Sequence, residues 1–421
     1  MIKLHPAVPV IVLLATAAGR LIAQDFDLHG FVQSNMSLRA ADAGGAVAPS
    51  GGALPDYLLV DERAQIEITR AGSGAGLLGR IDLFYDAVDE RAGIDLREAY
   101  IDLTLGSLDI RTGRQIITWG IGDLVFINDI FPKDWTAFLS GRPLEYLKFG
   151  SDAVNVNAYP GFLSAQIIIV PLYRPDILPS GGRLLFYSPF PPDAALVETR
   201  PGKGLENTQF AWRIFRPVFN YDISVYFYRG FHPSPPGAAY DPSAEVVTMF
   251  HPRLHTYGAS LQGPFLSGVI SLEVGYYDSR DDRDGKNPAV ENSQTRFLFG
   301  YQRAFGENFT AGIQYYGERM AQYGNYTLSL PAGSASRRQT RHTLSVRLTR
   351  LLNYQTLRLS FFTFYTPGDD DYFIKPSVSY DLGDGVWVET GATLVGGREE
   401  HTFFGQFEKN DNLYFLLRYA F

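Results

Sequence analysis

Apolar and polar residues alternate with a period of two along most of this chain. Residues 221–227 place Tyr, Ile, Val and Phe at odd positions and Asp, Ser and Tyr at even ones, and the final nine residues alternate in the same way up to Phe421. A period of two is that of a β-strand with one apolar and one polar face. The pattern predicts an all-β protein with strands near residues 26–38, 57–70, 76–88, 94–105, 107–118, 151–159, 162–173, 206–216, 219–230, 253–263, 267–279, 292–304, 308–321, 338–350, 355–366, 371–382, 385–396 and 410–421.

The connections between these strands alternate between tight and long ones. Gly106, Pro160-Gly161 and Gly383-Asp384 are typical of the tight set, and the long set is mostly polar. Short turns on one side and long loops on the other are typical of an outer-membrane barrel. We therefore expect a transmembrane antiparallel up-and-down β-barrel of about 18 strands, with 16 as the next alternative. A large secreted β-sandwich or solenoid is the soluble alternative.

Composition agrees with a barrel in the bacterial outer membrane. Aromatic residues make up 14% of the chain, which suits aromatic girdles at two membrane interfaces. Residues 1–23 have the positive start, apolar stretch and small-residue cleavage site of a signal peptide. This leaves residues 24–421 as a single barrel domain. Losing Lys3 and Arg20 with the signal takes the formal charge from −8 to −10, and this acidic balance argues against nucleic-acid binding.

The run from Glu98 to Gly120 carries the most motif-like residues. It reads Glu98-Ala-Tyr, then Gly113-Arg-Gln115 and Trp119-Gly120. This run resembles the strand pair of a broad group of bacterial outer-membrane porins that includes the alginate-export and phosphate-selective types. The C-terminal strand ending on Phe421 resembles the signature by which the barrel-assembly machinery recognises such proteins. The resemblance implies a porin-type barrel whose other partners are outer-membrane lipid, lipopolysaccharide and small solutes; it leaves the oligomeric state open.

Alternation places Glu98, Asp102 and Arg111 on the lumen side of adjacent strands, where opposite charges can pair. Such pairs either brace the wall or contribute to selectivity. Arg114 breaks the alternation, which predicts a bulge near Gly113 or a position at the barrel mouth.

Residues 119–150 are too long for a hairpin turn and mix charged with apolar residues, as functional loops do. We expect this loop to fold into the lumen and constrict it; the alternative is an outward loop packed on its neighbours.

A barrel of sixteen to eighteen strands leaves an aqueous channel. The expected function is passive diffusion of small hydrophilic solutes, with a preference for anions if inward arginines dominate. The alternatives are export of an acidic polysaccharide, and a plugged barrel with a structural or adhesion role. The candidate pore-lining and constriction residues are Arg80, Asp82, Glu98, Asp102, Arg111, Arg114, Asp123, Asp129, Lys133, Arg142, Arg213, Arg296, Arg347, Arg358 and Lys375.

Sequence signals for catalysis or metal binding are weak. His342 and Ser345 are three residues apart in a strand, so they point to opposite faces and cannot pair. Residues 280–291 have the outline of a calcium loop, but Arg280 occupies the first ligand position. The chain has no Cys, hence no disulfide and no lipoprotein anchor. We therefore expect this protein to have no enzymatic activity, no cofactor and no metal site.

Overall fold

The computed structural model describes residues 26–40, 56–179, 181–191 and 194–421. The signal peptide expected for residues 1–23 lies outside these described residues. In the described part, no helix is long and apolar enough to span a bilayer.

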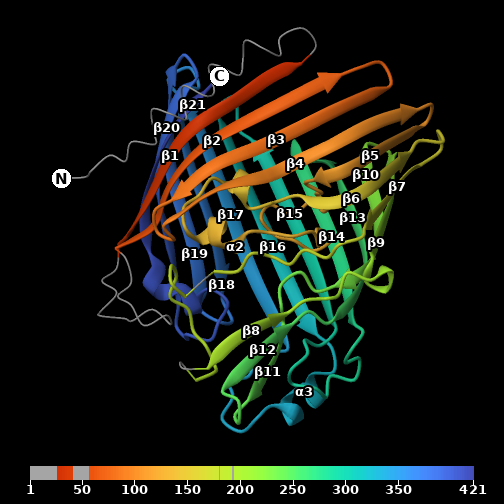
Figure 1. Cartoon of the computed structure of the whole chain (residues 1–421), viewed down its shortest axis with the longest axis vertical. Helices are drawn as coiled ribbons and strands as arrows, with labels where there is room; N and C mark the ends of the chain where they lie inside the picture. Colours follow the sequence, from red (N-terminus) through yellow and green to blue (C-terminus); the bar gives the residue numbers. More distant parts are fainter. Residues whose placement is uncertain (1–25, 41–55, 180, 192–193) are drawn as a thin grey trace.

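Eighteen antiparallel strands form one closed barrel, which confirms the expected fold class (Figure 1). The barrel closes where β1 pairs with β21, from Phe31 opposite Ala420 to Arg39 opposite Asn412. Gly30 and Phe421 exchange two backbone hydrogen bonds of 3.0 and 2.9 Å at the end of this seam. The final strand therefore joins the first one, and the barrel has no free edge.

All eighteen expected strands are present, each within three residues of its expected bounds. The strands are β1 (Asp27–Arg39), β2 (Tyr57–Ala71), β3 (Ala75–Asp86), β4 (Arg91–Leu105), β5 (Leu108–Gln115), β6 (Ser151–Ala158), β7 (Ser164–Val170), β9 (Gln209–Val218), β10 (Tyr221–Phe231), β13 (Arg253–Phe265), β14 (Gly268–Ser279), β15 (Gln294–Ala304), β16 (Phe309–Met320), β17 (Thr340–Leu352), β18 (Leu357–Thr366), β19 (Asp371–Gly383), β20 (Val386–Gly397) and β21 (Asn412–Ala420).

The tight turns and the chain terminus share one rim, and the long connections share the other. Three short strands in the long connections form a separate sheet in the order β8 (Ala195–Thr199), β12 (Val246–Phe250) and β11 (Gly237–Asp241). Figure 1 shows this sheet and helix α3 (Tyr323–Ser329) at the end of the barrel opposite the C-terminus. We did not predict this small sheet. Short 3₁₀ helices lie at Leu144–Tyr146, Leu205–Asn207 and Gly405–Asn410.

The strands bear apolar side chains outward and mainly polar ones inward. In β21, Leu413 and Phe415 are 57% and 45% exposed on the outer face, whereas Asn412 and Arg418 are buried on the inner face. This is the inverse of a soluble barrel, whose apolar face points inward, and it is the arrangement of a barrel that meets lipid.

The register of the described wall shifts between Ser37 and Leu38, between Asp381 and Gly383 and opposite Arg97, but not at Gly113, where a bulge was expected. Strands β4 and β5 keep a continuous register through Gly113, so a bulge there is wrong. Instead, Arg80 lies opposite Glu98 while Ile81 lies opposite Leu96, which leaves Arg97 as the extra residue. A bulge puts two consecutive side chains on one face, and Arg97 joins Glu98 inside the barrel. There it donates to the backbone oxygens of residues 145 and 148.

Candidate functional site

Residues 116–150, between β5 and β6, are called the infolded segment below. Their side chains and backbone contact inward-facing residues on β2, β14, β16, β17 and β19, so the segment crosses the lumen. It includes helix α2 (Trp135–Leu139), which Figure 1 shows within the outline of the barrel. Three anchors hold it to the wall.

The first anchor is Glu273 on β14. Its carboxylate accepts hydrogen bonds from the backbone N–H groups of Ile121 at 3.0 Å, Gly122 at 3.2 Å and Asn128 at 2.9 Å. The side-chain amide of Asn128 donates to it as well, at 2.9 Å. One buried carboxylate thus receives four donors from the infolded segment. It satisfies backbone groups that would otherwise be left unpaired in a buried loop.

Two glycines make room for this contact. Gly258 on β13 and Gly275 on β14 are directly opposite each other in the inner wall. A Cβ on Gly258 would lie 1.7 Å from the side-chain oxygen of Asn128, and one on Gly275 would lie 2.8 Å from the side chain of Ile127. Because any side chain would fill the space, glycine at these positions lets the infolded segment lie directly on the wall.

The second anchor is Asp123, which forms a two-pronged ion pair with Arg347 on β17. Gln314 on β16 supports it from both sides. The Gln314 carbonyl accepts from the backbone N–H of Asp123 at 2.7 Å, and its amide donates to the backbone oxygen of Asp123 at 2.9 Å. The position of Asp123 is therefore set by backbone and side-chain contacts together.

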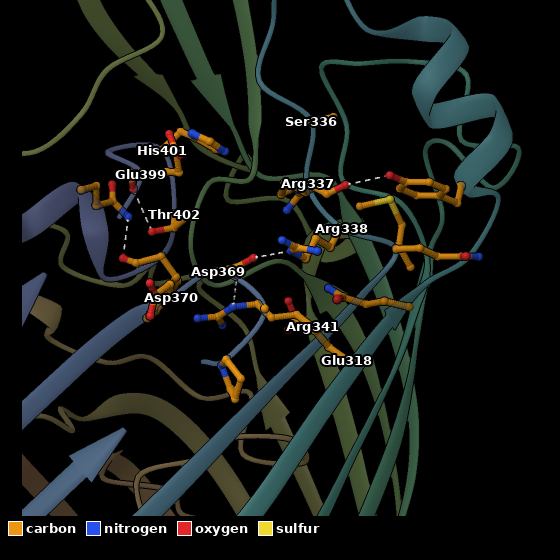
Figure 2. Close-up of a pocket in the computed structure, with 18 of the residues that line it drawn as sticks. Glu318, Ser336, Arg337, Arg338, Arg341, Asp369, Asp370, Glu399, His401 and Thr402 are labelled. Atoms are coloured by element: carbon orange, nitrogen blue, oxygen red, sulfur yellow. Dashed lines mark hydrogen bonds and ion pairs between the residues drawn. The ribbon is translucent and has the colours of Figure 1, made fainter. Parts of the chain in front are cut away.

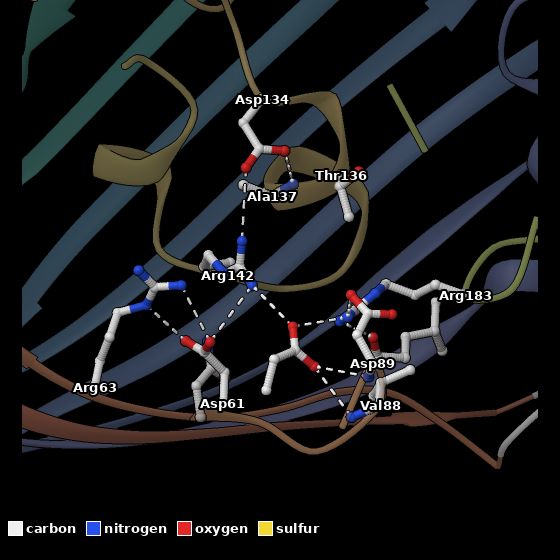
Figure 3. A network of polar contacts seen from close by, with 12 residues as sticks. Asp61, Arg63, Val88, Asp89, Asp134, Thr136, Ala137, Arg142 and Arg183 are labelled. Atoms are coloured by element: carbon white, nitrogen blue, oxygen red, sulfur yellow. Dashed lines mark hydrogen bonds and ion pairs between the residues drawn. The ribbon is translucent and has the colours of Figure 1, made fainter. Parts of the chain in front are cut away.

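The third anchor is a buried charge network (Figure 3). Asp134 begins α2 by accepting a hydrogen bond from the backbone N–H of Ala137 at 2.9 Å. Arg142 follows the helix, and its guanidinium lies 3.6 Å from Asp134, 3.5 Å from Asp61 on β2 and 3.6 Å from Asp86 on β3. Burial raises the pKa of Asp134, and Arg142 opposes that rise. One arginine thus ties the helix to two strands.

Two further arginines extend the network along the wall. Arg63 on β2 forms ion pairs of 2.9 Å with both Asp61 and Asp82. Arg183, from the connection between β7 and β9, lies 2.7 Å from both Asp86 and Asp89. The network therefore joins two long connections to β2 and β3. Of its members, only Asp82 and Arg142 are among the candidate pore-lining residues taken from the sequence.

Asp129 lies between two lysines of the same segment. Lys148 is 2.5 Å from its carboxylate, and the buried Lys133 is 3.4 Å away. The Lys133 ammonium also donates to the backbone oxygens of Asp129 and Phe131, each at 2.7 Å, and lies 4.4 Å from the ring centre of Phe126. Burial lowers the pKa of Lys133. These ion pairs link residues of the infolded segment that lie 4 and 19 positions apart in the sequence.

Apolar packing adds to the polar anchors. Trp119 packs edge-on against Phe131 with ring centres 5.3 Å apart, and its indole N–H donates to Gln166 on β7 at 2.7 Å. Phe138 of α2 stacks on Phe373 of β19 with ring centres 4.5 Å apart. Each side of the segment therefore shares a buried apolar cluster with the wall.

The predicted charges of β3 and β4 pair across the strands. Arg80 lies 2.5 Å from both Glu67 and Glu98, and Asp102 lies 2.7 Å from Arg111. Because these residues are opposite each other in register, the pairs cross-link adjacent strands.

Arg114 pairs instead with Asp152 on β6 at 2.8 Å. Arg114 and Asp152 are each two positions from Thr112 and Val154, whose side chains point outward. This pair therefore lies on the outer face, next to the long loops.

Four other predicted cations have no carboxylate within 4 Å in the described part of the chain. Arg213 donates to Ser224 at 3.1 and 2.9 Å, and Arg296 lies 4.0 Å from the ring centre of Tyr277. The other two are Lys375, which lies 5.0 Å from the ring centre of Tyr414, and Arg358, which is exposed opposite Ser379.

Cavities lie on both sides of the infolded segment. On the side of the long loops, a cavity of about 390 Å³ has Leu124 and Phe126 in its lining, together with Arg296 on β15. On the side of the tight turns, a cavity of about 280 Å³ is lined by Asp123 and Arg347. The stretch from Asp123 to Phe126 therefore separates the two cavities.

A wider vestibule of about 880 Å³ lies at the rim of the long loops (Figure 2). Arg338 and Arg341 line one side and both form ion pairs with Asp369 on the other, at 3.2 and 3.1 Å. Arg337 pairs with Glu291 at 3.0 Å, so most of the vestibule's arginines are balanced by acids.

The part of the chain that the structure describes holds no group of three or more His, Asp or Glu arranged to bind a metal ion. His342 stacks on Tyr315, whereas Ser345 receives a hydrogen bond from Gln314 in the lumen at 2.8 Å. They lie on opposite faces of β17.

Comparison with known proteins agrees with the barrel. OccD3 of Pseudomonas aeruginosa is 10% identical, with 94% of this chain and 91% of that chain covered and a TM-score of 0.55. OccK11 of the same organism is 10% identical, with coverages of 94% and 95% and a TM-score of 0.51. A mutant porin of Rhodopseudomonas blastica aligns with 12% identity, coverages of 94% and 100% and a TM-score of 0.43.

No family model and no curated protein matches the sequence. At such low identities, the likeness to OccD3 and OccK11 concerns the fold. The chain has the closed, all-antiparallel β-barrel fold of porins. The alginate-export or phosphate-selective subgroup that the Glu98–Gly120 run suggested is not established by these matches.

Proposed function

We propose that this protein is an outer-membrane channel for the passive diffusion of small hydrophilic solutes. The observation that carries the proposal is a closed 18-strand barrel with solvent cavities on both sides of the infolded segment. A barrel of this strand number encloses more space than its own side chains fill. The outward apolar belt supports insertion in a membrane.

In this proposal the infolded segment limits the size of the solutes. It is held by Glu273, by Arg347 and by the Arg142 network, and it narrows the lumen between the cavities on its two sides. The vestibule at the rim of the long loops leads toward the cavity beside Phe126, because Arg341 and Phe403 line both.

The finer proposal is a preference for anions. Arg213, Arg358 and Lys375 face the inner part of the lumen without a carboxylate partner among the described residues. Unpaired cations along a pore attract anions. Asp222 and Glu389 also face inward and reduce the expected preference without reversing it.

The test is single-channel recording of the refolded mature protein in a planar bilayer, with a salt gradient across it. We expect a stable conductance and a reversal potential on the anion side, which Lys375→Gln and Arg213→Gln each reduce. Arg350→Gln is the control, because Arg350 has outward parity on β17. A cation-selective reversal potential in the wild type contradicts the anion preference.

One observation favours a second candidate, a barrel that is closed at rest. The infolded segment shares two buried apolar clusters with the wall, as a plug would. A correctly folded barrel without measurable conductance supports this candidate over the open channel.

A further inference from the structure

The charged residues on the outer face of the barrel differ between its two ends. In the half of the described strands next to the tight turns, every charged residue with outward parity is an arginine. Each lies one or two residues from the end of its strand, so all of them share nearly the same depth. They are Arg70 on β2, Arg216 on β9, Arg303 on β15 and Arg350 on β17. The lumen at the same end instead carries both signs, as in the pair of Asp102 with Arg111.

Two of these arginines lie on either side of β16. Arg303 is opposite Ala311, and Arg350 is opposite Phe309, two residues away on the same outward face of β16. Strands about 4.8 Å apart with a rise of about 3.4 Å per residue put the Cα atoms of the two arginines about 12 Å apart. Two extended arginine side chains can bridge this separation across a single phosphate group. At the depth of Arg303, β16 contributes only the methyl group of Ala311 to the space between them.

Neither arginine has an acidic partner among the described residues. Glu307, in the turn between β15 and β16, forms an ion pair with neither of them. The guanidinium of Arg303 lies 5.1 Å from the ring centre of Phe305, and its Nε is buried without a hydrogen-bond partner. Arg350 is exposed. A guanidinium that rests on an aromatic ring keeps its N–H donors available to an anion.

The surface next to the two arginines is apolar. The rings of Phe305 and Phe309 are 5.8 Å apart. Farther from the tight turns, Phe299 on β15 and Ile313 on β16 are exposed on the same outer face. The order along the wall is therefore arginine, aromatic and then apolar residues. This is the order of a surface that meets the phosphate layer, the interface and the acyl chains of a lipid.

We propose that Arg303 and Arg350 together bind the phosphate of an anionic glycerophospholipid in the periplasmic leaflet, with its acyl chains along β15–β17. The inference rests on the membrane location in the proposed function, in which the tight turns are periplasmic. Each guanidinium donates N–H groups to the phosphate oxygens. A zwitterionic lipid binds more weakly, because its own ammonium group competes for the phosphate and repels the arginines.

Quenching of a tryptophan reporter by brominated lipids tests the proposal. The refolded mature protein carrying Phe309→Trp is placed in vesicles that contain brominated phosphatidylglycerol or brominated phosphatidylcholine, and the signal of the 4 native Trp residues is subtracted with the wild type. We expect phosphatidylglycerol to be preferred by about 10- to 30-fold at low ionic strength. Adding Arg303→Gln and Arg350→Gln together should bring this ratio close to one.

The matched control reporter is Leu105→Trp, at the tight-turn end of β4, where the neighbouring outward residues of β4 and β5 are uncharged. It should show no preference. Equal preference at both reporters, no preference at Phe309→Trp, or a preference that survives both Gln substitutions would overturn the proposal.

Heat-modifiable migration shows whether each variant is folded, and Ile313→Trp on the same strand replaces Phe309→Trp if that variant is not. A conducting barrel without the lipid preference overturns this inference alone. A lipid preference in a barrel that does not conduct leaves the inference standing and removes the proposed channel.

Discussion

Replacing Glu273 should release the infolded segment from β14 while leaving the barrel intact. The Glu273 carboxylate receives three backbone N–H groups and one side-chain amide from the segment. Glu273→Gln keeps the shape of the side chain, but it removes the charge and turns one acceptor oxygen into a donor amide. That amide then points at N–H groups that also donate, so roughly half of the contacts are lost.

The size of the effect follows from the number of contacts. Hydrogen bonds to a charged acceptor contribute about 1.5–3 kcal/mol each, and the segment borders aqueous cavities where water can replace part of the loss. Losing two such bonds should weaken the anchor by about 3 kcal/mol. A change of this size raises the population of the detached segment by roughly 100-fold, since about 1.4 kcal/mol corresponds to a factor of ten.

Single-channel recording measures this population. We expect Glu273→Gln to show frequent transitions to a larger conductance that the wild type visits rarely. The control is Glu389→Gln, since Glu389 on β20 also faces the lumen but accepts its hydrogen bond from Tyr414 on the wall, at 3.0 Å. Wild-type conductance and noise in folded Glu273→Gln would refute the reasoning, because the segment would then be held without this anchor.

Three further predictions concern other charged groups. Arg347→Gln should leave Asp123 unpaired beside the inner cavity, which favours cations over anions by about 1 kcal/mol more than in the wild type and moves the reversal potential toward the cation side. An unchanged reversal potential would show that the pair lies off the permeation path. Arg142→Met should leave the buried Asp134 without its cation and lower the unfolding free energy, measured by urea titration, by about 3–5 kcal/mol. Adding Asp134→Asn to this variant should restore most of the lost unfolding free energy. If the two substitutions instead lower it additively, the pairing is contradicted. Burial lowers the pKa of His232 from 6.5 to about 4, so the unfolded chain binds the proton first as the pH falls. The unfolding free energy should therefore drop by at most about 3 kcal/mol between pH 6.5 and pH 4. His232→Gln should flatten this part of the pH profile of the unfolding free energy, and an equally steep profile in that variant would assign the loss to other groups.

The strands could be predicted from the sequence because each property that defines them is local. A period of two, a turn residue at one end and a polar loop at the other are all read within about a dozen residues. The sheet of β8, β12 and β11 was missed because its strands have only five residues each and lie inside long connections. The pairing of β8 with β12 joins residues about fifty positions apart, as in Thr199 with Phe250, and no local pattern reports that.

The same limit applies to the site. The pairing of Asp102 with Arg111 was predictable, because a two-residue turn sets the register of adjacent strands. Alternation gives the face of a residue but neither its depth nor its partner across the lumen. Alternation along β14 puts Glu273 on the inner face, yet its contact with Asn128 spans 145 positions. The opposed Gly258 and Gly275 are the sequence signal for this contact, and they are recognisable only when the register of β13 and β14 is known.

The distribution of charges divides the lumen into two halves with different roles. Along β2–β5 most inward arginines are paired with acids, as in Arg63 with Asp82 and Arg80 with Glu98, while Arg97 donates to backbone oxygens of the infolded segment. The Arg142 network fixes the infolded segment against this side. The cavities within the barrel are instead lined by residues of β9–β18, where Arg213 and Arg296 lack a carboxylate partner in the described chain. Ion pairs that are buried and hydrogen-bonded resist rearrangement, whereas unpaired cations beside water-filled space remain available to a passing solute. Substitutions along β2–β5 should therefore change stability, and substitutions along β9–β18 should change conductance and selectivity.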